Sequence, residues 1–383
     1  MRKALPGIII ILSIFHTACH KQEFHHNDSP ESRNNEVSQG PLPCAMKEDV
    51  ARTASAMARK SRTTTATTPV VLLLDFNGYT LQNSPWNPEN SWNCPAVPAA
   101  KLTKAMKDEI FANVSEDFSA FQVIVTKNET EYASAAPDRR MRCVITHNMT
   151  GQFGNIGGTA FVSSMAWGDD TPCFVFCDPL LYNAQYISGA VSHELGHTFG
   201  LQHQARFDSG CSMLEEYHSG EGDGALSWAP IMGLSYYKSL VTWHKGTPVT
   251  GCYDIQPDAE MISETADFKS DDFADALNNS AFLLPTTGSR DGRLEQACDR
   301  DAFRKNEAGA KRIRIISAGN VDLAMEVYNM NGNLVAVHDD PGGTGLNVVI
   351  NGKKYLRIRA SSDQPFVPEG DGFGSYSIRI SNP

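Results

Sequence analysis

The sequence predicts a mixed α+β domain followed by an all-β domain, and two patterns in the chain lead to this fold class. Between residues 70 and 265, short apolar runs alternate with segments whose apolar side chains recur at helical spacing. This alternation indicates a mixed sheet flanked by helices. From residue 266 to residue 383, helical periodicity fades and turn-forming residues separate short strand-like runs, as is typical of a β-sandwich.

Individual elements follow from local composition. A helix is expected at residues 100–117, where Leu102, Met106, Ile110 and Val114 recur at helical spacing. Further helices are expected at residues 183–199 and 257–264. Strands are expected at residues 70–76, 121–125, 142–146, 158–163, 174–176, 323–328, 334–337, 346–350, 355–358 and 376–380.

Length and charge limit the classes of function. The chain has 383 residues, of which 41% are hydrophobic, so it can bury the cores of two domains and still carry extensions. The net charge of −11 and the lack of a basic block argue against DNA or RNA as a partner. No apolar run reaches the roughly 18 residues that a membrane-spanning helix requires. The sequence carries no signal for an oligomeric state.

The first 19 residues have the layout of an export signal. A basic start at Met1–Lys3 precedes an apolar stretch at residues 5–15, and Thr17-Ala18-Cys19 follows. The small residues before Cys19 resemble a bacterial lipoprotein cleavage box, although His16 stands where such boxes usually carry Leu. We therefore expect an exported protein, held at the cell surface or outer membrane only by a lipid on Cys19. The alternative is a plain secretion signal and a secreted protein.

Residues 20–69 form the expected tether and linker between the signal and the first domain. This stretch is polar and ends in a Thr-rich run without apolar periodicity. Arg59, Lys60 and Arg62 offer a processing site for a trypsin-like protease. The alternative is an exposed linker whose basic residues have no role.

Cysteine usage agrees with export. The chain has nine cysteines, and setting Cys19 aside leaves eight, which predicts up to four disulfides of undetermined pairing. Cys173 and Cys177 end an expected strand about 13 Å long, so they should not pair with each other. The eight cysteines are Cys44, Cys94, Cys143, Cys173, Cys177, Cys211, Cys252 and Cys298.

The residues that carry chemistry lie between positions 193 and 203. His193 and His197 are four apart, so a helix places both imidazoles on one face. Gly200 can take the left-handed conformation that ends the helix and returns His203 as a third ligand. Three neutral nitrogens leave one zinc position open for water, whose proton Glu194 can accept. The alternatives are a zinc site without activity and ordinary helix histidines.

The run from His193 to His203 resembles the long zinc motif of the metzincin metallopeptidases, closest to bacterial enzymes of the reprolysin-like group. The segment 229–233 resembles their Met-turn. The resemblance implies a zincin-type catalytic domain at residues 70–265, with Glu194 as general base and Met232 supporting the histidines from below. It also implies that substrate lies extended along an edge strand, for which residues 157–163 are our candidate.

Some positions depart from the pattern of that family. Gln204 stands where many reprolysin-like enzymes have Asp, which leaves the support of the third histidine in doubt. Leu234 occupies the position of a tyrosine that some members use, and Tyr236 and Tyr237, which come later, are interpreted as packing residues. Cys44 could cap the zinc, but its neighbours do not match the family's motif, so a disulfide role is favoured.

Residues 266–383 resemble the bacterial pre-peptidase C-terminal domain, a small β-sandwich found beside secreted peptidases. An unrelated sandwich that only stabilises the first domain is the alternative. An acidic stretch lies at the start of this part, and because it lacks the spacing of a known calcium loop, we interpret it as a solvated face, with Ca²⁺ unsupported. Its members are Asp267, Asp271, Asp272 and Asp275.

Together these features predict a zinc-dependent endopeptidase that holds one catalytic Zn²⁺ and acts on extracellular proteins or peptides. The alternative is a surface adhesin or binding protein whose zinc domain is inactive. Glu194 favours the enzyme, because an inactive site has no need of a base beside the zinc.

Overall fold

The computed structural model describes residues 45–47 (backbone only), 68–81, 84–87, 96–147, 149, 153–296, 298–361 and 372–383. The expected export signal, Cys19, most of the tether, Cys44 and Cys94 lie outside these residues. Within them, no helix is both long and apolar enough to cross a membrane.

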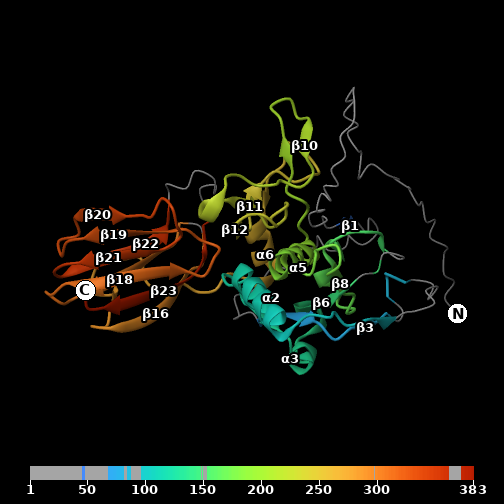
Figure 1. The fold of residues 1–383 in the computed structure, drawn as a ribbon, viewed down its shortest axis with the longest axis horizontal. Coiled ribbons are helices and arrows are strands. Elements are labelled where there is room, and N and C mark those ends of the chain that lie inside the picture. The colour runs from blue at the N-terminus through green and yellow to red at the C-terminus, as the bar shows by residue number, and fades with distance from the viewer. Residues whose placement is uncertain are drawn as a thin grey trace, which may run out of the picture. The chain divides into compact units, whose positions relative to one another are not determined.

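The predicted mixed α+β class is confirmed by a six-stranded sheet with helices on both faces (Figure 1). Strands β2, β5, β6 and β8 run parallel, β7 runs antiparallel to β8, and β1 pairs in parallel with the outer side of β7. The expectation that residues 157–163 form the sheet edge is therefore wrong, because β1 covers β7. In sheet order the strands are β1 (Ala45–Lys47), β7 (Gly158–Phe161), β8 (Cys173–Phe176), β6 (Arg140–Thr146), β2 (Val70–Asp75) and β5 (Val123–Thr126).

The first five residues of strand β2 are apolar because both faces of the strand are buried. Leu72 and Leu74 belong to the main core with residues of α2 (Lys104–Asp117) and α5 (Ala184–Thr198). On the other face, Val71 and Leu73 pack with Tyr132 of the short helix α3 (Glu129–Ser134). Side-chain oxygens of Thr103 and Asn183 accept backbone N–H groups and so cap α2 and α5.

The segments between the main elements carry several short helices and strands. A helix, α6 (Asp258–Ala266), confirms the one expected at residues 257–264. The short strands pair as β3 (Tyr79–Thr80) with β4 (Ala96–Val97), β9 (Arg206–Phe207) with β10 (Met213–Glu215), β11 (Trp228–Pro230) with β12 (Leu240–Thr242), and β13 (Lys245–Gly246) with β14 (Gln256–Pro257). Single 3₁₀ turns lie at Pro137–Arg139, Ser164–Trp167 and Gly224–Leu226.

The last part of the chain forms a five-stranded and a four-stranded sheet, whose inward side chains join one hydrophobic cluster. Burial alternates along β23, for example, as expected for a strand with one face on a core. In sheet order the strands are β15 (Phe282–Leu283), β17 (Arg300–Lys305), β22 (Lys354–Ala360), β19 (Leu323–Tyr328) and β20 (Leu334–His338), then β16 (Gly288–Leu294), β23 (Gly374–Ser381), β18 (Lys311–Ser317) and β21 (Leu346–Ile350).

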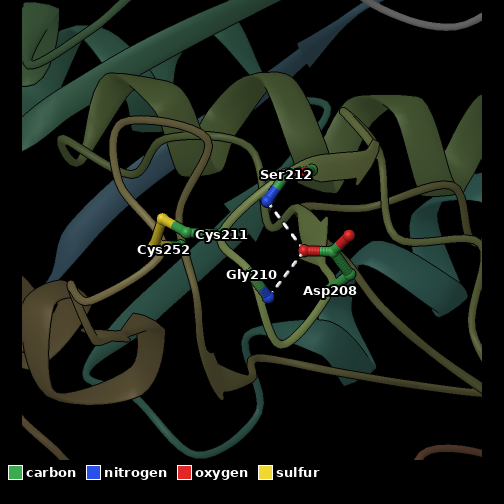
Figure 2. The surroundings of a disulfide bond; sticks show 5 residues. All are labelled: Asp208, Gly210, Cys211, Ser212 and Cys252. Carbon is green, nitrogen blue, oxygen red and sulfur yellow. Dashed lines mark hydrogen bonds between the residues drawn. A yellow bond between two sulfur atoms is a disulfide. The ribbon is translucent and has the colours of Figure 1, made fainter.

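One disulfide, between Cys211 and Cys252, joins the turn of the β9–β10 hairpin to the loop before β14 (Figure 2). Oδ1 of Asp208 accepts the backbone N–H groups of Gly210 and Ser212 and so fixes this turn, at 2.8 and 2.9 Å. The bridge therefore holds a hairpin that would otherwise have little buried apolar surface.

Disulfide formation was expected, and one bridge lies among the described residues. The upper limit of four is not reached, because Cys173, Cys177 and Cys298 are free thiols. The thiols of Cys143, Cys173 and Cys177 are buried in and beside β6 and β8, where they pack as small apolar side chains. Burial raises the pKa of Cys177 to about 12, so it stays a thiol. Cys173 and Cys177 are unpaired, as their strand positions predicted.

Replacing both Cys211 and Cys252 with Ala should lower the free energy of unfolding by up to about 4 kcal/mol. This is the loop-closure entropy for a sequence separation of 41 residues. Urea denaturation of both proteins measures the difference. Cys298→Ala, which removes an exposed free thiol, is the control and should change little. An equal loss in the two variants would show that the bridge contributes nothing.

Candidate metal centre

Helix α5 and the turn after it bring three imidazoles together. His193 and His197 lie one turn apart on α5, and Gly200, with a φ of 107°, reverses the chain so that His203 returns to them. Their ring centroids lie 4.8 to 5.2 Å apart, and one ring nitrogen of each lies within 4.8 Å of the others. All three side chains are buried, so the predicted ligand set is assembled in space.

Backbone carbonyls fix the orientation of the two helical imidazoles. Nδ1 of His193 lies 2.9 Å from the carbonyl oxygen of Ile231, and Nδ1 of His197 lies 2.7 Å from that of Leu201. A carbonyl only accepts, so each Nδ1 carries the proton and each Nε2 presents a lone pair. These two Nε2 atoms are buried and have no hydrogen-bond partner within the described part of the chain. That pattern is the one expected of metal-ligating histidines.

The surroundings keep all three rings neutral. Burial lowers the pKa of His193 to about 4, and the pKa of His197 and of His203 falls well below the usual value. For His197 and His203, burial is the main cause and repulsion from the neighbouring imidazoles adds to it. Because metal ions bind only the neutral imidazole, this triad can hold a metal ion at neutral pH.

Glu194 lies directly beside the triad and is fully buried. Its carboxylate packs against Gly158 of β7, where an added Cβ would lie 2.6 Å from Oε1. Any larger residue at position 158 would displace this carboxylate. The same strand–helix contact is fixed farther along by the backbone N–H of Ser163, which donates to the carbonyl of His197 at 2.9 Å.

The segment predicted to be a Met-turn lies beneath α5. Met232 is fully buried, and its Sδ would be only 2.5 Å from a Cβ added to Gly196, so the sulfur occupies the space that this glycine leaves. The carbonyl of Met232 accepts the backbone N–H of Gln204 at 2.8 Å. The carbonyl of the preceding residue, Ile231, holds the ring of His193. This turn is therefore hydrogen-bonded both to the first histidine and to the residue that follows the third.

Gln204, the residue after the third histidine, is buried, and its side-chain amide is held by hydrogen bonds. Its Nε2 donates to Oδ1 of Asp258 at 2.8 Å and to the carbonyl of Gln256 at 3.2 Å. The side chain of Gln256 donates to the same carboxylate oxygen at 2.9 Å. Asp258, the first residue of α6, is completely buried. An amide donating to a buried carboxylate therefore anchors the segment after His203.

Two residues that the sequence analysis did not single out lie against His203. The Tyr217 ring is centred 4.1 Å from the His203 ring, and Oε1 of Glu216 lies 3.5 Å from its Nδ1. Both follow the disulfide-held hairpin, and no spacing rule could have placed them there. Tyr236 and Tyr237 instead contact Tyr186 near the start of α5, consistent with their interpretation as packing residues.

Asp117, at the end of α2, supports α5 from behind and was also missed. Its carboxylate accepts hydrogen bonds from the hydroxyl of Ser192 and from Nδ2 of Asn320, the latter at 2.8 Å. Burial raises the pKa of Asp117 to about 7. The residue next to His193 is thus tied to a second helix and to the loop between β18 and β19.

Comparisons with known proteins do not assign a family. No family model matches the chain, and no curated protein matches it. Similar solved structures include the pre-peptidase C-terminal domain of collagenase from Bacillus anthracis (16% identity, 26% of this chain and 93% of that one, TM-score 0.20). They also include Aeromonas hydrophila PliG, a periplasmic inhibitor of g-type lysozyme (11%, 26% and 95%, 0.20), and myroilysin (13%, 47% and 58%, 0.25). At such low TM-scores, function has to be inferred from the geometry of the site.

Gly196→Ala should destabilise the protein by about 1–3 kcal/mol, because the new methyl group must displace Met232. Gly189→Ala, on the same helix, is the control, since its Cβ would meet the Ser235 hydroxyl at 3.3 Å and the Tyr236 ring at an ordinary contact distance of 3.8 Å. It should be neutral or stabilising by up to about 1 kcal/mol from helix propensity. Urea denaturation of the two variants tests this, and equal stabilities would contradict the packing described for Met232.

Proposed function

We propose that this chain is an exported, metzincin-like zinc endopeptidase that hydrolyses peptide bonds of extracellular proteins. The observation that carries the proposal is a buried triad of neutral imidazoles, two with unused Nε2 atoms, beside a buried glutamate. In this proposal residues 70–265 form the catalytic domain and residues 266–383 an accessory domain. Residues 1–19 act as the export signal with a lipid on Cys19, and residues 20–69 as the tether.

The residues present fit one catalytic zinc ion. His193, His197 and His203 would hold it through neutral nitrogens, and three ligands leave a position for water or substrate. When bound, zinc would supply a Lewis acid that polarises the scissile carbonyl and lowers the pKa of a water molecule to about 7. Glu194 accepts the proton of the attacking water on a carboxylate oxygen and delivers it to the leaving amine nitrogen. Gly158 and Met232 hold the base and the helix in place.

The backbone of strand β7 would bind the substrate peptide. An extended peptide could add as a strand to the outer side of β7, which lies next to Glu194. In the structure that side is taken by β1, with Ala45, Met46 and Lys47 paired to Thr159, Ala160 and Phe161. Peptide binding therefore requires β1 to leave, and cleavage in the basic stretch at residues 59–62 could release it.

Glu194→Gln should lower the rate of casein cleavage by about 10²–10⁴-fold while the protein keeps its metal, because only the proton acceptor is lost. A fluorescent casein assay and elemental analysis measure the two quantities. Glu260→Gln, an exposed carboxylate on α6 outside the site, is the control and should retain the wild-type activity. A Glu194→Gln variant as fast as the wild type would end the proposal. A metal-loaded wild type that cleaves nothing would favour the inactive binding protein.

Met46→Pro should increase kcat/KM for casein in the full-length chain. Proline removes a backbone N–H and disfavours strand pairing, so β1 should release β7 more often. Met46→Ala, which keeps the backbone N–H, is the matched control and should stay near the wild-type rate. If the two variants have the same kcat/KM, β1 does not compete with substrate.

A further inference from the structure

Five carboxylates converge where the segment after α6 meets the C-terminal sheets. Asp271 and Asp272 come from that segment, Glu295 directly follows β16, and Asp299 and Asp301 lie just before and on β17. They form two groups, and within each the carboxylate oxygens lie within 4.8 Å of one another. One group is Asp271, Asp272 and Glu295, and the other is Asp271, Asp299 and Asp301.

Two of these carboxylates are buried and incompletely satisfied. Glu295 is 1% exposed and Asp301 is 0% exposed. Neither oxygen of Glu295 has a hydrogen-bond partner among the residues that the structure describes, and the same is true of Oδ1 of Asp301. Oδ2 of Asp301 accepts the hydroxyl of Tyr376. Buried anionic oxygens without partners are costly unless a cation compensates them, so these atoms point to a missing ligand.

The cationic side chains nearby balance only part of this charge. Arg293 forms an ion pair with Glu295, with 3.3 Å between its Nε and Oε1 but without hydrogen-bond geometry, and no such pair is formed by Asp301 among the described residues. Lys269 directs its Nζ to the carbonyl of Ser119 at 2.8 Å. Burial, together with the neighbouring carboxylates, raises the pKa of Glu295 to about 8 and that of Asp301 to about 9. Without a metal ion, these two carboxylates would therefore take up protons at neutral pH. A bound metal ion would take the place of those protons.

We propose that this cluster binds divalent cations and that Ca²⁺ is the ion its chemistry selects. Every donor is a carboxylate oxygen, the ligand of hard cations. Two oxygens bound to one Ca²⁺ can lie up to about 4.6–5.2 Å apart. In each group one oxygen of every carboxylate lies within 4.8 Å of the others, so the three can reach a common ion. Asp271 belongs to both groups, so it could bridge two ions. The proposal replaces the interpretation of Asp271 and Asp272 as a solvated face.

A bound cation would connect three parts of the chain. A cation in the first group would tie the segment after α6 to the end of β16, which belongs to the four-stranded sheet. A cation in the second group would tie the same segment to β17, which belongs to the five-stranded sheet. None of its ligands takes part in the histidine triad, so occupancy should change stability without being needed for zinc binding.

Calcium titration of the full-length protein tests the site. The protein, freed of calcium by dialysis and holding its other metal, is titrated with CaCl₂ in a calorimeter, and its Tm is measured with about 5 mM CaCl₂ or MgCl₂. We expect at least one Ca²⁺ per chain and a Tm higher by a few degrees, with a smaller rise in Mg²⁺. Absence of binding, or equal rises in the two salts, would overturn the proposal of a calcium site.

Variants locate the binding. Asp271→Asn changes an exposed residue shared by both groups, so the protein should fold and its calcium affinity should fall at least about tenfold. Asp275→Asn, an exposed acid of the same segment outside both groups, should bind as the wild type does. Equal affinities of Asp271→Asn and Asp275→Asn would show that calcium binds elsewhere.

Discussion

Three neutral imidazoles held in one small buried volume are the constraint on which the site depends. Burial keeps the rings of His193, His197 and His203 unprotonated, and backbone carbonyls in two turns select the tautomer of the helical pair. The carbonyl of Leu201 is placed by the reversal at Gly200. A shift of either turn would therefore change the direction of the Nε2 lone pairs of His193 and His197. The loops around α5 thus set the orientation of these imidazoles as well as packing against the helix.

Two glycines beside or on α5 are needed for the close packing of the site. Gly158 gives the Glu194 carboxylate its place against β7, and Gly196 gives Met232 its place beneath the helix. Sheet, helix and turn thereby approach one another more closely than side chains would allow. Gln204 holds the next segment through a buried amide–carboxylate hydrogen bond and so supports the chain directly after the third histidine.

The sequence allowed prediction where a local pattern reflects a local cause. Apolar runs marked the buried strands of the six-stranded sheet, and histidine spacing with Gly200 located the triad. Strands β16, β17 and β18 were missed because charged residues interrupt their apolar patterns. In β17 two of these charged residues, Asp301 and Lys305, are even buried. The pairing of β1 with β7, the contact of Tyr217 with His203 and the Cys211–Cys252 disulfide join segments that no local pattern connects.

X-ray absorption at the zinc edge of the purified full-length protein reports the ligands of the metal. We expect one zinc per chain, with three imidazole nitrogens and one exchangeable oxygen as ligands. Substituting His197 should lower the number of imidazole ligands or abolish zinc uptake. A protein that takes up no zinc, or a zinc whose four ligands all come from protein side chains, would rule out the proposed site.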